Sequence, residues 1–348
     1  MNRILIYGAN GYTGELIAEE AVRRGLKPIL AGRNRDALEV LARRLRLTRR
    51  VFELGDAAEV ARNFEGIDVL LNCAGPFVET CPPLLEACLV LKVHYLDITG
   101  EIDVYALCHH AHNRARHQGV VVVPGVGFDV VPTDCVAAML KERMPDANEL
   151  VLAFEAGGGP SPGTTRTSVA GLARGGRVRR NGEIVDVPLA WKVREFERDG
   201  VRRSAMTIPW GDVYTAYVST GIPNIETYMA VSPHTIARTR WLERLRPLLR
   251  LRAVRKFVET RAVARAKGPD AERRRTTACH VWGEVRNAAG REEKLALKTP
   301  NGYALTVDAS LGILERVLAT RPAGGYYTPS QLVGARYVLS LPGVALVE

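Results

Sequence analysis

Three glycines near the start of the chain have a spacing that suits phosphate binding. Gly8, Gly11 and Gly14 follow a short apolar run and precede a helical pattern. Gly8 permits a tight turn, Gly11 lets the backbone approach a pyrophosphate, and Gly14 lets the helix pack closely on the strand. The helix N-terminus offers N–H donors and a positive dipole end to the phosphates. The segment therefore predicts a dinucleotide site, although NAD sites typically have the spacing G-x-G-x-x-G.

The end of the second expected strand selects the cofactor. An NAD enzyme carries an acidic side chain there, which binds the ribose 2′-hydroxyl. This chain has Gly32 and Arg33 instead. A guanidinium pairs with phosphate oxygens in a forked geometry and stacks on aromatic rings such as adenine. The predicted cofactor is therefore NADP(H).

Two further loops are expected to complete the cofactor site. Asp56 follows the third expected strand and is placed to reach the adenine. The loop 72–76 follows the fourth strand and is expected beside the nicotinamide ribose. The predicted cofactor-binding residues are Gly8, Asn10, Gly11, Tyr12, Thr13, Gly14, Gly32, Arg33, Asp56, Asn72, Ala74, Gly75 and Pro76.

Two carboxylates follow later strands of the same expected sheet. Glu101 comes after the strand 94–98, and Asp129 lies in the crossover after the strand 120–123. The cofactor carries the hydride, so the protein must orient the acceptor and deliver a proton. Glu101 and Asp129 are therefore the predicted catalytic residues. The alternative is that both carboxylates cap helices or tie two domains together, because carboxylates favour helix starts.

Three polar residues are the predicted substrate contacts. Asp97 begins the loop that ends at Glu101, so it is expected near the nicotinamide. Thr164 and Arg166 follow the glycine-rich stretch 157–163, whose small residues would let a substrate approach closely. The alternative for this stretch is a mobile linker.

No metal site is predicted. The six cysteines include no C-x-x-C pair and are interpreted as reduced thiols. His109, His110, His112 and His117 crowd one expected helix, and Cys108 with His112 has the i, i+4 spacing of two ligands. A third ligand is not evident, so a solvated helix face is favoured.

Strands and helices alternate through the first part of the chain. The expected strands are 3–7, 28–32, 51–54, 69–73, 94–98 and 120–123. This alternation predicts a parallel Rossmann sheet with helices on both of its faces.

The pattern changes after residue 134. The turn pairs Asn181-Gly182 and Asp199-Gly200 indicate hairpins, and 213–219, 225–231 and 278–285 are expected strands. The fold class is thus α/β, with a second α+β domain built on a largely antiparallel sheet. The predicted domains are an NADP-binding domain (1–130), a substrate domain (131–325) and a C-terminal segment (326–348) that packs back on the Rossmann domain.

One segment carries the excess positive charge. The chain has a net charge of +10, and 234–275 contains fourteen Lys/Arg and four Asp/Glu, which alone give +10. Nucleic acid is therefore not an expected partner. Within 236–264, Trp241, Leu245 and Leu248 recur at helical spacing among arginines, and Pro247 is expected to break or kink the helix. The segment predicts docking on an anionic membrane or an acidic carrier protein; the alternative is an ordinary helix with its apolar side in the core.

Length and composition describe an ordinary globular protein. The 348 residues, 47% hydrophobic and 25% charged, favour two domains. No apolar run approaches the ~20 residues of a membrane span, and the first residues lack the pattern of a signal peptide. The expected location is the cytoplasm, with a peripheral membrane association if 236–264 docks there.

Several motifs resemble the saccharopine dehydrogenase-like family. They are 8–14 with 31–33, 94–101, 124–129 and 132–134. Motifs at 268–273, 282–284, 299–303, 328–329 and 341–344 resemble its trans-acting enoyl reductase branch. The resemblance implies an NADP-dependent oxidoreductase, in a family that includes amino-acid dehydrogenases and polyketide or lipid enoyl reductases.

Three functions are consistent with this sequence. The first is NADPH-dependent reduction of a C=C bond in a lipid- or polyketide-type substrate. The second is a saccharopine dehydrogenase-type reaction at an amino-acid C–N bond, and the third is a non-catalytic NADP-binding protein that docks on membranes or partners. The expected partners are a small-molecule or acyl-type substrate, an anionic membrane or acidic carrier protein, and a second copy of the chain in a homodimer.

Overall fold

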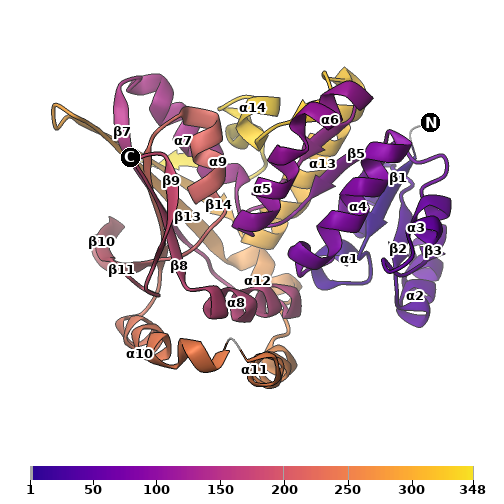
Figure 1. The fold of residues 1–348 in the computed structure, drawn as a ribbon, viewed down its shortest axis with the longest axis horizontal. Helices are drawn as coiled ribbons and strands as arrows, with labels where there is room; N and C mark the ends of the chain where they lie inside the picture. Colours follow the sequence, from indigo (N-terminus) through magenta and orange to yellow (C-terminus); the bar gives the residue numbers. More distant parts are fainter. Residues whose placement is uncertain (1–2, 199, 250, 348) are drawn as a thin grey trace. The chain divides into compact units, whose positions relative to one another are not determined.

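The computed structural model of the protein describes residues 3–198, 200–249 and 251–347 (Figure 1). The chain divides into two compact units. The first comprises the residues up to Val131 together with Tyr303–Val333, and the second comprises Pro132–Gly302 together with the residues from Gly334 on. The chain therefore passes between the units three times.

The first unit is built on a seven-stranded parallel sheet. Its strand order is β15-β6-β5-β4-β1-β2-β3. The strands are β1 (Ile4–Tyr7), β2 (Ile29–Gly32), β3 (Arg49–Val51), β4 (Val69–Asn72), β5 (His94–Asp97), β6 (Val121–Val123) and β15 (Gly325–Tyr326). Every residue of β1, β4 and β6 is buried, as expected for strands covered on both faces. This arrangement confirms the predicted Rossmann sheet.

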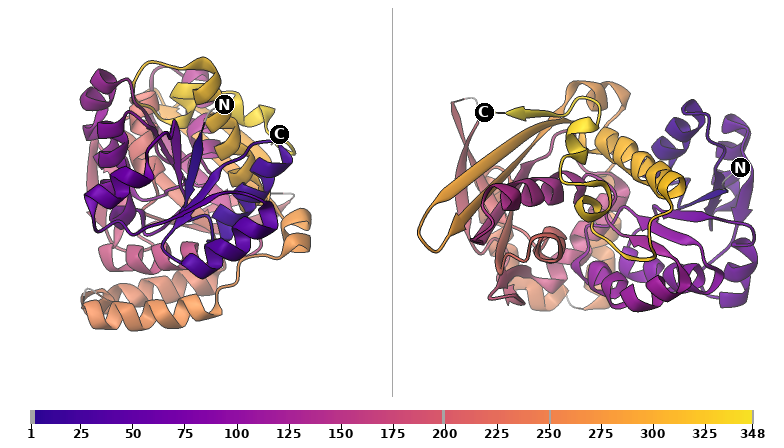
Figure 2. Two further views of the ribbon diagram at one scale, coloured as in Figure 1. Left: turned by 90° about the vertical axis from the view of Figure 1, so that its right-hand side faces the viewer. Right: turned by 90° about the horizontal axis from the view of Figure 1, so that it is seen from above.

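Helices cover both faces of the parallel sheet (Figure 2). They are α1 (Tyr12–Arg23), α2 (Arg35–Leu45), α3 (Ala57–Asn63), α4 (Phe77–Leu91), α5 (Ile102–His110), α6 (His112–Gln118), α13 (Gly302–Thr320) and α14 (Pro329–Val333). The winding reverses between β1 and β4, at the centre of the sheet. In open α/β sheets, ligands bind beyond the carboxyl ends of the strands at this switch point.

The late residues of the chain belong to different units from those predicted. Helix α13 was assigned to the substrate domain, but it packs in the first unit, where Arg24 Nη2 of α1 lies 2.6 Å from Asp308 Oδ1. Strand β15 extends the parallel sheet beside β6. From Gly334 on, the chain belongs to the second unit, because β16 (Ala345–Val347) pairs with β14 (Glu292–Pro300) of that unit. The 326–348 segment is thus split between the units, and only its first part joins the Rossmann sheet.

Two of the clustered histidines hold β15 in place. Tyr326 N donates a hydrogen bond to His112 Nδ1 at 3.2 Å, and the His109 ring stacks on Tyr326 with centroids 4.7 Å apart. These contacts correct the predicted solvated face for those two residues. The sequence hides them because Tyr326 lies more than two hundred residues later.

The second unit is built on a mixed, mostly antiparallel sheet. Its strand order is β10-β11-β12-β7-β13-β14-β16, with β8 paired to β12 and β9, and only β12 and β7 pair in parallel. The strands before β16 are β7 (Ala147–Glu155), β8 (Gly176–Arg180), β9 (Glu183–Val187), β10 (Val193–Arg198), β11 (Val201–Thr207), β12 (Asn224–Ala230), β13 (Ala278–Asn287) and β14 (Glu292–Pro300). The helices are α7 (Val131–Arg143), α8 (Pro162–Arg174), α9 (Asp212–Thr220), α10 (Pro233–Leu249), α11 (Arg252–Arg265) and α12 (Ala271–Thr276), and a 3₁₀ helix spans Tyr337–Ser340. The predicted fold class is confirmed.

Turn chemistry predicted one hairpin of the second unit correctly. Asn181 (φ 49°) and Gly182 (φ +84°) connect β8 to β9 in the left-handed conformations that a type I′ turn requires. At the second predicted hairpin, Gly200 has φ +70° and Arg198 pairs with Val201, while Asp199 lies outside the described residues.

The expected strand 213–219 is wrong. Its β-branched and aromatic residues form helix α9, which buries Val213, Ala216 and Thr220 on one side and ends at Gly221 (φ +70°). The i, i+3, i+7 spacing of those three residues fits a helix, and it prevails over the strand propensity of the composition.

Within the described residues, no helix is long and apolar enough to cross a bilayer.

Candidate active site

The loops after β1 and β4 touch at the switch point of the sheet. Gly8 has φ +80°, and a Cβ added to it would lie 2.8 Å from Ala74 N. Cys73 N donates to Tyr7 O at 2.8 Å, which ties the two strand ends together. Gly8 therefore faces the backbone and the methyl group of Ala74, and a larger residue at this position would separate the two loops.

Helix α1 starts at this crevice. Gly11 is its N-cap and has no side chain to cap the first turn, so no side chain competes with a phosphate there. A Cβ on Gly14 would collide with the carbonyl oxygen of Gly8. Gly8 thus adopts a left-handed turn and Gly14 lets α1 pack closely on the strand end, while binding of a dinucleotide at this loop stays a prediction.

Arg33 lies exposed at the end of β2, immediately after the buried Gly32. Burial raises the pKa of Tyr7 at the end of β1 to about 12, and the charge of Arg33 partly opposes that rise, which places the guanidinium near Tyr7. The next residue, Asn34, caps α2 by accepting from Ala37 N at 3.1 Å. Arg33 is therefore held at the start of a helix with its side chain in solvent, where a 2′-phosphate could pair with it.

Two other predicted cofactor residues make contacts within the protein. Asp56 is exposed and caps α3, because its Oδ1 accepts from Ala58 N at 2.8 Å. Asn72 is buried; its Oδ1 accepts from Ala74 N at 3.0 Å and its Nδ2 donates to Thr80 Oγ1 at 3.0 Å. Asn72 thus braces the 72–76 loop, and the contact of Asp56 with adenine stays a prediction.

Glu101 caps a helix from another loop. Its carboxylate accepts from Phe77 N at 2.8 Å and from Val78 N at 3.3 Å, at the start of α4. The N-cap residue of α4, Pro76, offers no side-chain cap. The negative charge of Glu101 at this helix start is favourable. This is the structural alternative considered for Glu101, and its proton-handling role stays a prediction.

Replacing Glu101 with glutamine should lower the free energy of unfolding by about 1–2 kcal/mol, because one acceptor oxygen and the charge at the α4 start are lost. Urea unfolding at neutral pH measures this change. The matched control is Glu65→Gln, at an exposed position, which should change stability by less than about 0.5 kcal/mol. Equal stabilities of the two variants would contradict the capping role.

Asp129 occupies a recess formed by Gly100. A Cβ on Gly100 would lie 2.9 Å from Asp129 Oδ2, so only glycine leaves room for this carboxyl group. Asp129 is half-buried. Burial raises its pKa to about 7, and the nearby charge of Glu101 adds to the rise. An acid with that pKa can donate and regain a proton near neutral pH.

The placement of Asp97 contradicts its predicted role as a substrate contact. The side chain is fully buried, and its oxygens accept from Thr99 N at 3.0 Å, Gly125 N at 2.9 Å and Tyr95 Oη at 2.8 Å. Burial raises its pKa to about 6, and these hydrogen bonds limit the rise. Asp97 joins the loops after β5 and β6. The sequence pattern of the strands cannot reveal this role of Asp97, because one of its donors, Gly125 N, comes from a distant loop.

Asp97 also lies near two core thiols. Ligand atoms of Cys81, Asp97 and Cys108 lie within 4.8 Å of one another, and the two sulfurs are 3.7 Å apart. Burial raises the pKa of the Cys108 thiol well above its usual range. Since Asp97 already accepts three hydrogen bonds, we interpret this trio as core packing.

Thr164 and Arg166 lie in the second unit, on α8. Thr164 is in the first turn, where its Oγ1 lies 3.1 Å from the capping Ser161 Oγ. Arg166 Nε donates to Glu259 Oε1 of α11 at 2.9 Å. Arg166 therefore ties α8 to α11, and its contact with a substrate stays a prediction.

Two residues beside the cofactor loops escaped the sequence analysis. The Tyr303 ring packs edge-to-face on Tyr12, with centroids 4.9 Å apart. Thr306 Oγ1 accepts from Phe128 N at 2.9 Å, next to Asp129. The start of α13 thus contacts both the glycine-rich turn and the Asp129 segment. The motif at 299–303 marks this part of the chain in the sequence, but its residue types do not indicate contacts with Tyr12 or with Phe128.

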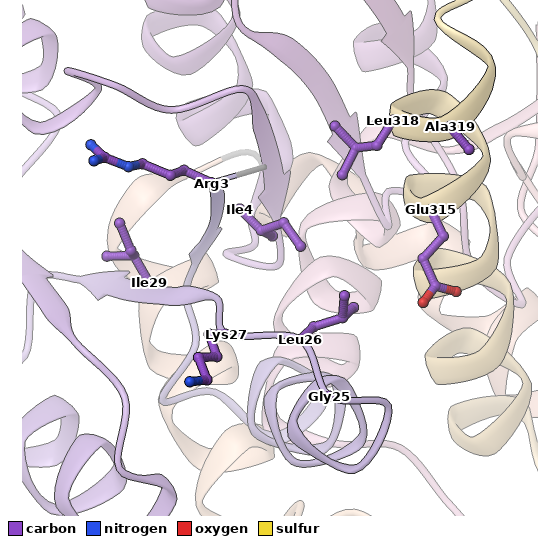
Figure 3. A pocket seen from close by; sticks show the side chains of 9 residues that line it. All are labelled: Arg3, Ile4, Gly25, Leu26, Lys27, Ile29, Glu315, Leu318 and Ala319. Carbon is purple, nitrogen blue, oxygen red and sulfur yellow. The ribbon is translucent and has the colours of Figure 1, made fainter. Parts of the chain in front are cut away.

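A cavity of about 420 Å³ lies at the opposite edge of the sheet (Figure 3). It lies beside Ile4 and Ile29, the first residues of β1 and β2, and α13 contributes Leu318. This position is at the amino ends of the strands, away from the ligand edge of such sheets. The cavity is therefore not the nucleotide crevice.

Comparisons with known proteins agree with this site. Residues 4–123 match the family described as saccharopine dehydrogenase NADP binding domain. A human saccharopine dehydrogenase-like oxidoreductase is 26% identical over 161 residues, which are 40% of this chain and 38% of that protein. A Mycobacterium tuberculosis protein described as a candidate trans-acting enoyl reductase is 29% identical over 183 residues, which are 46% of this chain and 42% of that protein. The matches thus span less than half the length of these relatives.

A solved structure shares the whole fold. Apo saccharopine dehydrogenase (L-Glu forming) from Saccharomyces cerevisiae has a TM-score of 0.68 with full coverage of both chains, at 11% identity. That likeness concerns the fold alone. The family match over residues 4–123 agrees with the resemblance drawn from the sequence: this part of the chain is similar to the saccharopine dehydrogenase NADP binding domain.

Proposed function

We propose that the protein is an NADPH-dependent reductase of a C=C bond in a lipid- or polyketide-type acyl substrate. The observation that carries the proposal is Asp129, a half-buried acid seated against Gly100 at the carboxyl edge of the sheet. It lies beside loops that fit the dinucleotide. The similarity to a candidate enoyl reductase supports the choice of substrate class.

The residues of the chain would divide the reaction between them. NADPH, when bound, supplies a hydride to one carbon of the double bond. Asp129 donates its proton to the other carbon and is reprotonated from water. Gly8 and Gly14 keep the crevice open for the pyrophosphate, and Arg33 binds the 2′-phosphate.

A C–N reaction is the second candidate, favoured by the whole-chain fold shared with saccharopine dehydrogenase. Such substrates carry several carboxylates and would need clustered cationic side chains. Arg166, the one candidate singled out for that purpose, is paired with Glu259. This pairing favours the acyl substrate. A non-catalytic protein that binds NADP remains the third candidate.

The decisive experiment follows NADPH consumption with 2-enoyl thioesters of increasing chain length, with imines and with keto acids. The proposal expects turnover of enoyl thioesters, and saturated products that carry deuterium when deuterium-labelled NADPH is used. Turnover of imines or keto acids alone would establish the second candidate. NADPH binding without any turnover would support the third.

A further inference from the structure

Helices α10 and α11 expose large apolar side chains. Five described apolar side chains larger than valine are more than half exposed, and four of them lie between residues 241 and 257. They are Trp241 (56%), Leu248 (52%), Leu251 (55%) and Phe257 (59%). Exposed apolar side chains that gather in one segment indicate an interaction surface. Leu245, which was expected to share this surface, is half-buried.

The exposed positions follow helical faces. Trp241, Arg244 and Leu248 are spaced i, i+3, i+7 on α10, and Lys256, Phe257 and Thr260 are close neighbours on one face of α11. The two helices lie side by side on the outside of α8, at the bottom of Figure 1, and both contact it. Pro247 does not end α10, which continues to Leu249.

The other sides of these helices are anchored in the second unit. Ile236 and Leu249 are buried. Arg240 Nε donates to Ala190 O at 3.2 Å, and Arg246 Nη1 donates to Arg174 O at 3.2 Å. The core-facing alternative therefore holds for one side of α10 and fails for the other, and no described residue of α11 is buried. The exposed side is a fixed part of the fold.

The acidic side chains of these two helices form ion pairs, whereas several of their basic side chains are exposed. The two acids of the pair of helices, Glu243 and Glu259, are bound by Arg246 and Arg166. Arg238, Arg244 and Lys256 are exposed and form no ion pair with any described residue. Arg261 lies over the exposed Phe257 ring at 4.8 Å. The outer surface therefore combines unpaired cations with aromatic and aliphatic side chains.

We infer that this surface, formed by α10, α11 and Leu251, docks the protein on an anionic lipid membrane. Aromatic rings and leucines insert at the boundary of headgroups and acyl chains, while arginine and lysine bind anionic headgroups. An acidic carrier protein would match the cations alone, and it would leave Trp241, Leu248, Leu251 and Phe257 unexplained. The inference rests on the surface itself and not on the proposed reaction.

The experiment is co-sedimentation of the full chain with vesicles of phosphatidylglycerol and phosphatidylcholine, and with phosphatidylcholine vesicles alone. Binding to the anionic vesicles at low salt is expected, with a large reduction at high salt. Absence of binding to anionic vesicles at low salt would overturn the inference, and so would equal binding to the neutral vesicles.

Two variants separate the apolar and charged contributions. Trp241→Ser with Phe257→Ser should weaken vesicle binding by about tenfold or more, because two aromatic rings no longer insert. Arg244→Glu with Lys256→Glu should weaken it by at least about tenfold. Circular dichroism and retained NADPH binding confirm that each variant is folded.

Matched controls change similar residues elsewhere. Val90→Ser alters an exposed apolar residue on α4, and Arg316→Glu alters an exposed arginine on α13. Both should bind vesicles within about twofold of the unaltered protein, since neither lies on the docking surface. Loss of binding in the controls to the same extent as in the α10–α11 variants would contradict the inference.

Discussion

The Asp129→Asn variant should reduce the substrate with a kcat lowered by about 10²–10⁴-fold, the usual contribution of general acid catalysis. The Asn amide has nearly the same shape and fits the recess at Gly100, so NADPH affinity should change by less than about threefold. Single-turnover measurements with saturating NADPH give the chemical step. Asp103→Asn, at an exposed position of α5, is the control and should retain its rate.

The pH dependence gives an independent signature of Asp129. As a proton donor it acts in the protonated form, so the reduction rate should fall as pH rises through the raised pKa of about 7. The variant should lose this dependence. If the variant retains most of the activity and the same pH profile, Asp129 is not the donor.

The same pKa shift affects stability. A carboxyl group whose pKa is raised on folding stabilises the protein below its unfolded pKa, and this contribution is lost as pH rises through the folded value. The window for Asp129 thus runs from about 4 to about 7. Above this window, the asparagine variant should be more stable than the parent protein in urea, by at most about 4 kcal/mol, because a shift of about three pKa units corresponds to that free energy.

Arg33→Ala should weaken NADPH binding by about 1.5–3 kcal/mol, which is roughly 10–150-fold, and should barely alter NADH binding. The exposed guanidinium at the end of β2 is the predicted partner of the 2′-phosphate, and NADH lacks that group. Fluorescence or calorimetric titration with both cofactors measures the change. Arg62→Ala, at an exposed position of α3, is the control for loss of positive charge.

The ratio of NADPH affinity to NADH affinity decides whether Arg33 contacts the 2′-phosphate. The unaltered protein should prefer NADPH, and the variant should lose most of that preference. Equal affinity of the unaltered protein for the two cofactors, or an equal loss of both in the variant, would contradict a specific contact with the 2′-phosphate.

Local sequence was enough to predict the nucleotide loops. Gly8 contacts Ala74, sixty-six residues later, whereas Gly14 contacts backbone within the same short segment, so its spacing carries the information. The alternation of buried strands and helices predicted the parallel sheet for the same reason. Arg33 follows the second strand, and the alternation of strands and helices already predicts where that strand ends.

Contacts between distant segments could not be predicted in this way. The contacts of the Asp97 and Glu101 carboxylates could not be anticipated, because they include donors from Gly125 and from the start of α4. The partner of Arg166 lies ninety-three residues away. Neither periodicity nor a motif in one sequence identifies two side chains that are distant in the chain but bonded in the fold. The type of a side chain shows only which chemistry it could perform.

The discontinuous first unit has a consequence for synthesis of the chain. Strand β15 and helix α13 are translated only after the roughly 170 residues of Pro132–Gly302, which take about 10–35 s at typical elongation rates. Until then, the nascent nucleotide-binding unit has an unpaired edge at β6 and lacks the helix that buries Leu305, Leu311 and Leu314. Open strand edges invite aggregation. Cotranslational folding of the cofactor unit is therefore completed only after Tyr303–Val333 have been synthesised, and a premature stop codon before residue 303 would disable it although residues 4–123 are intact.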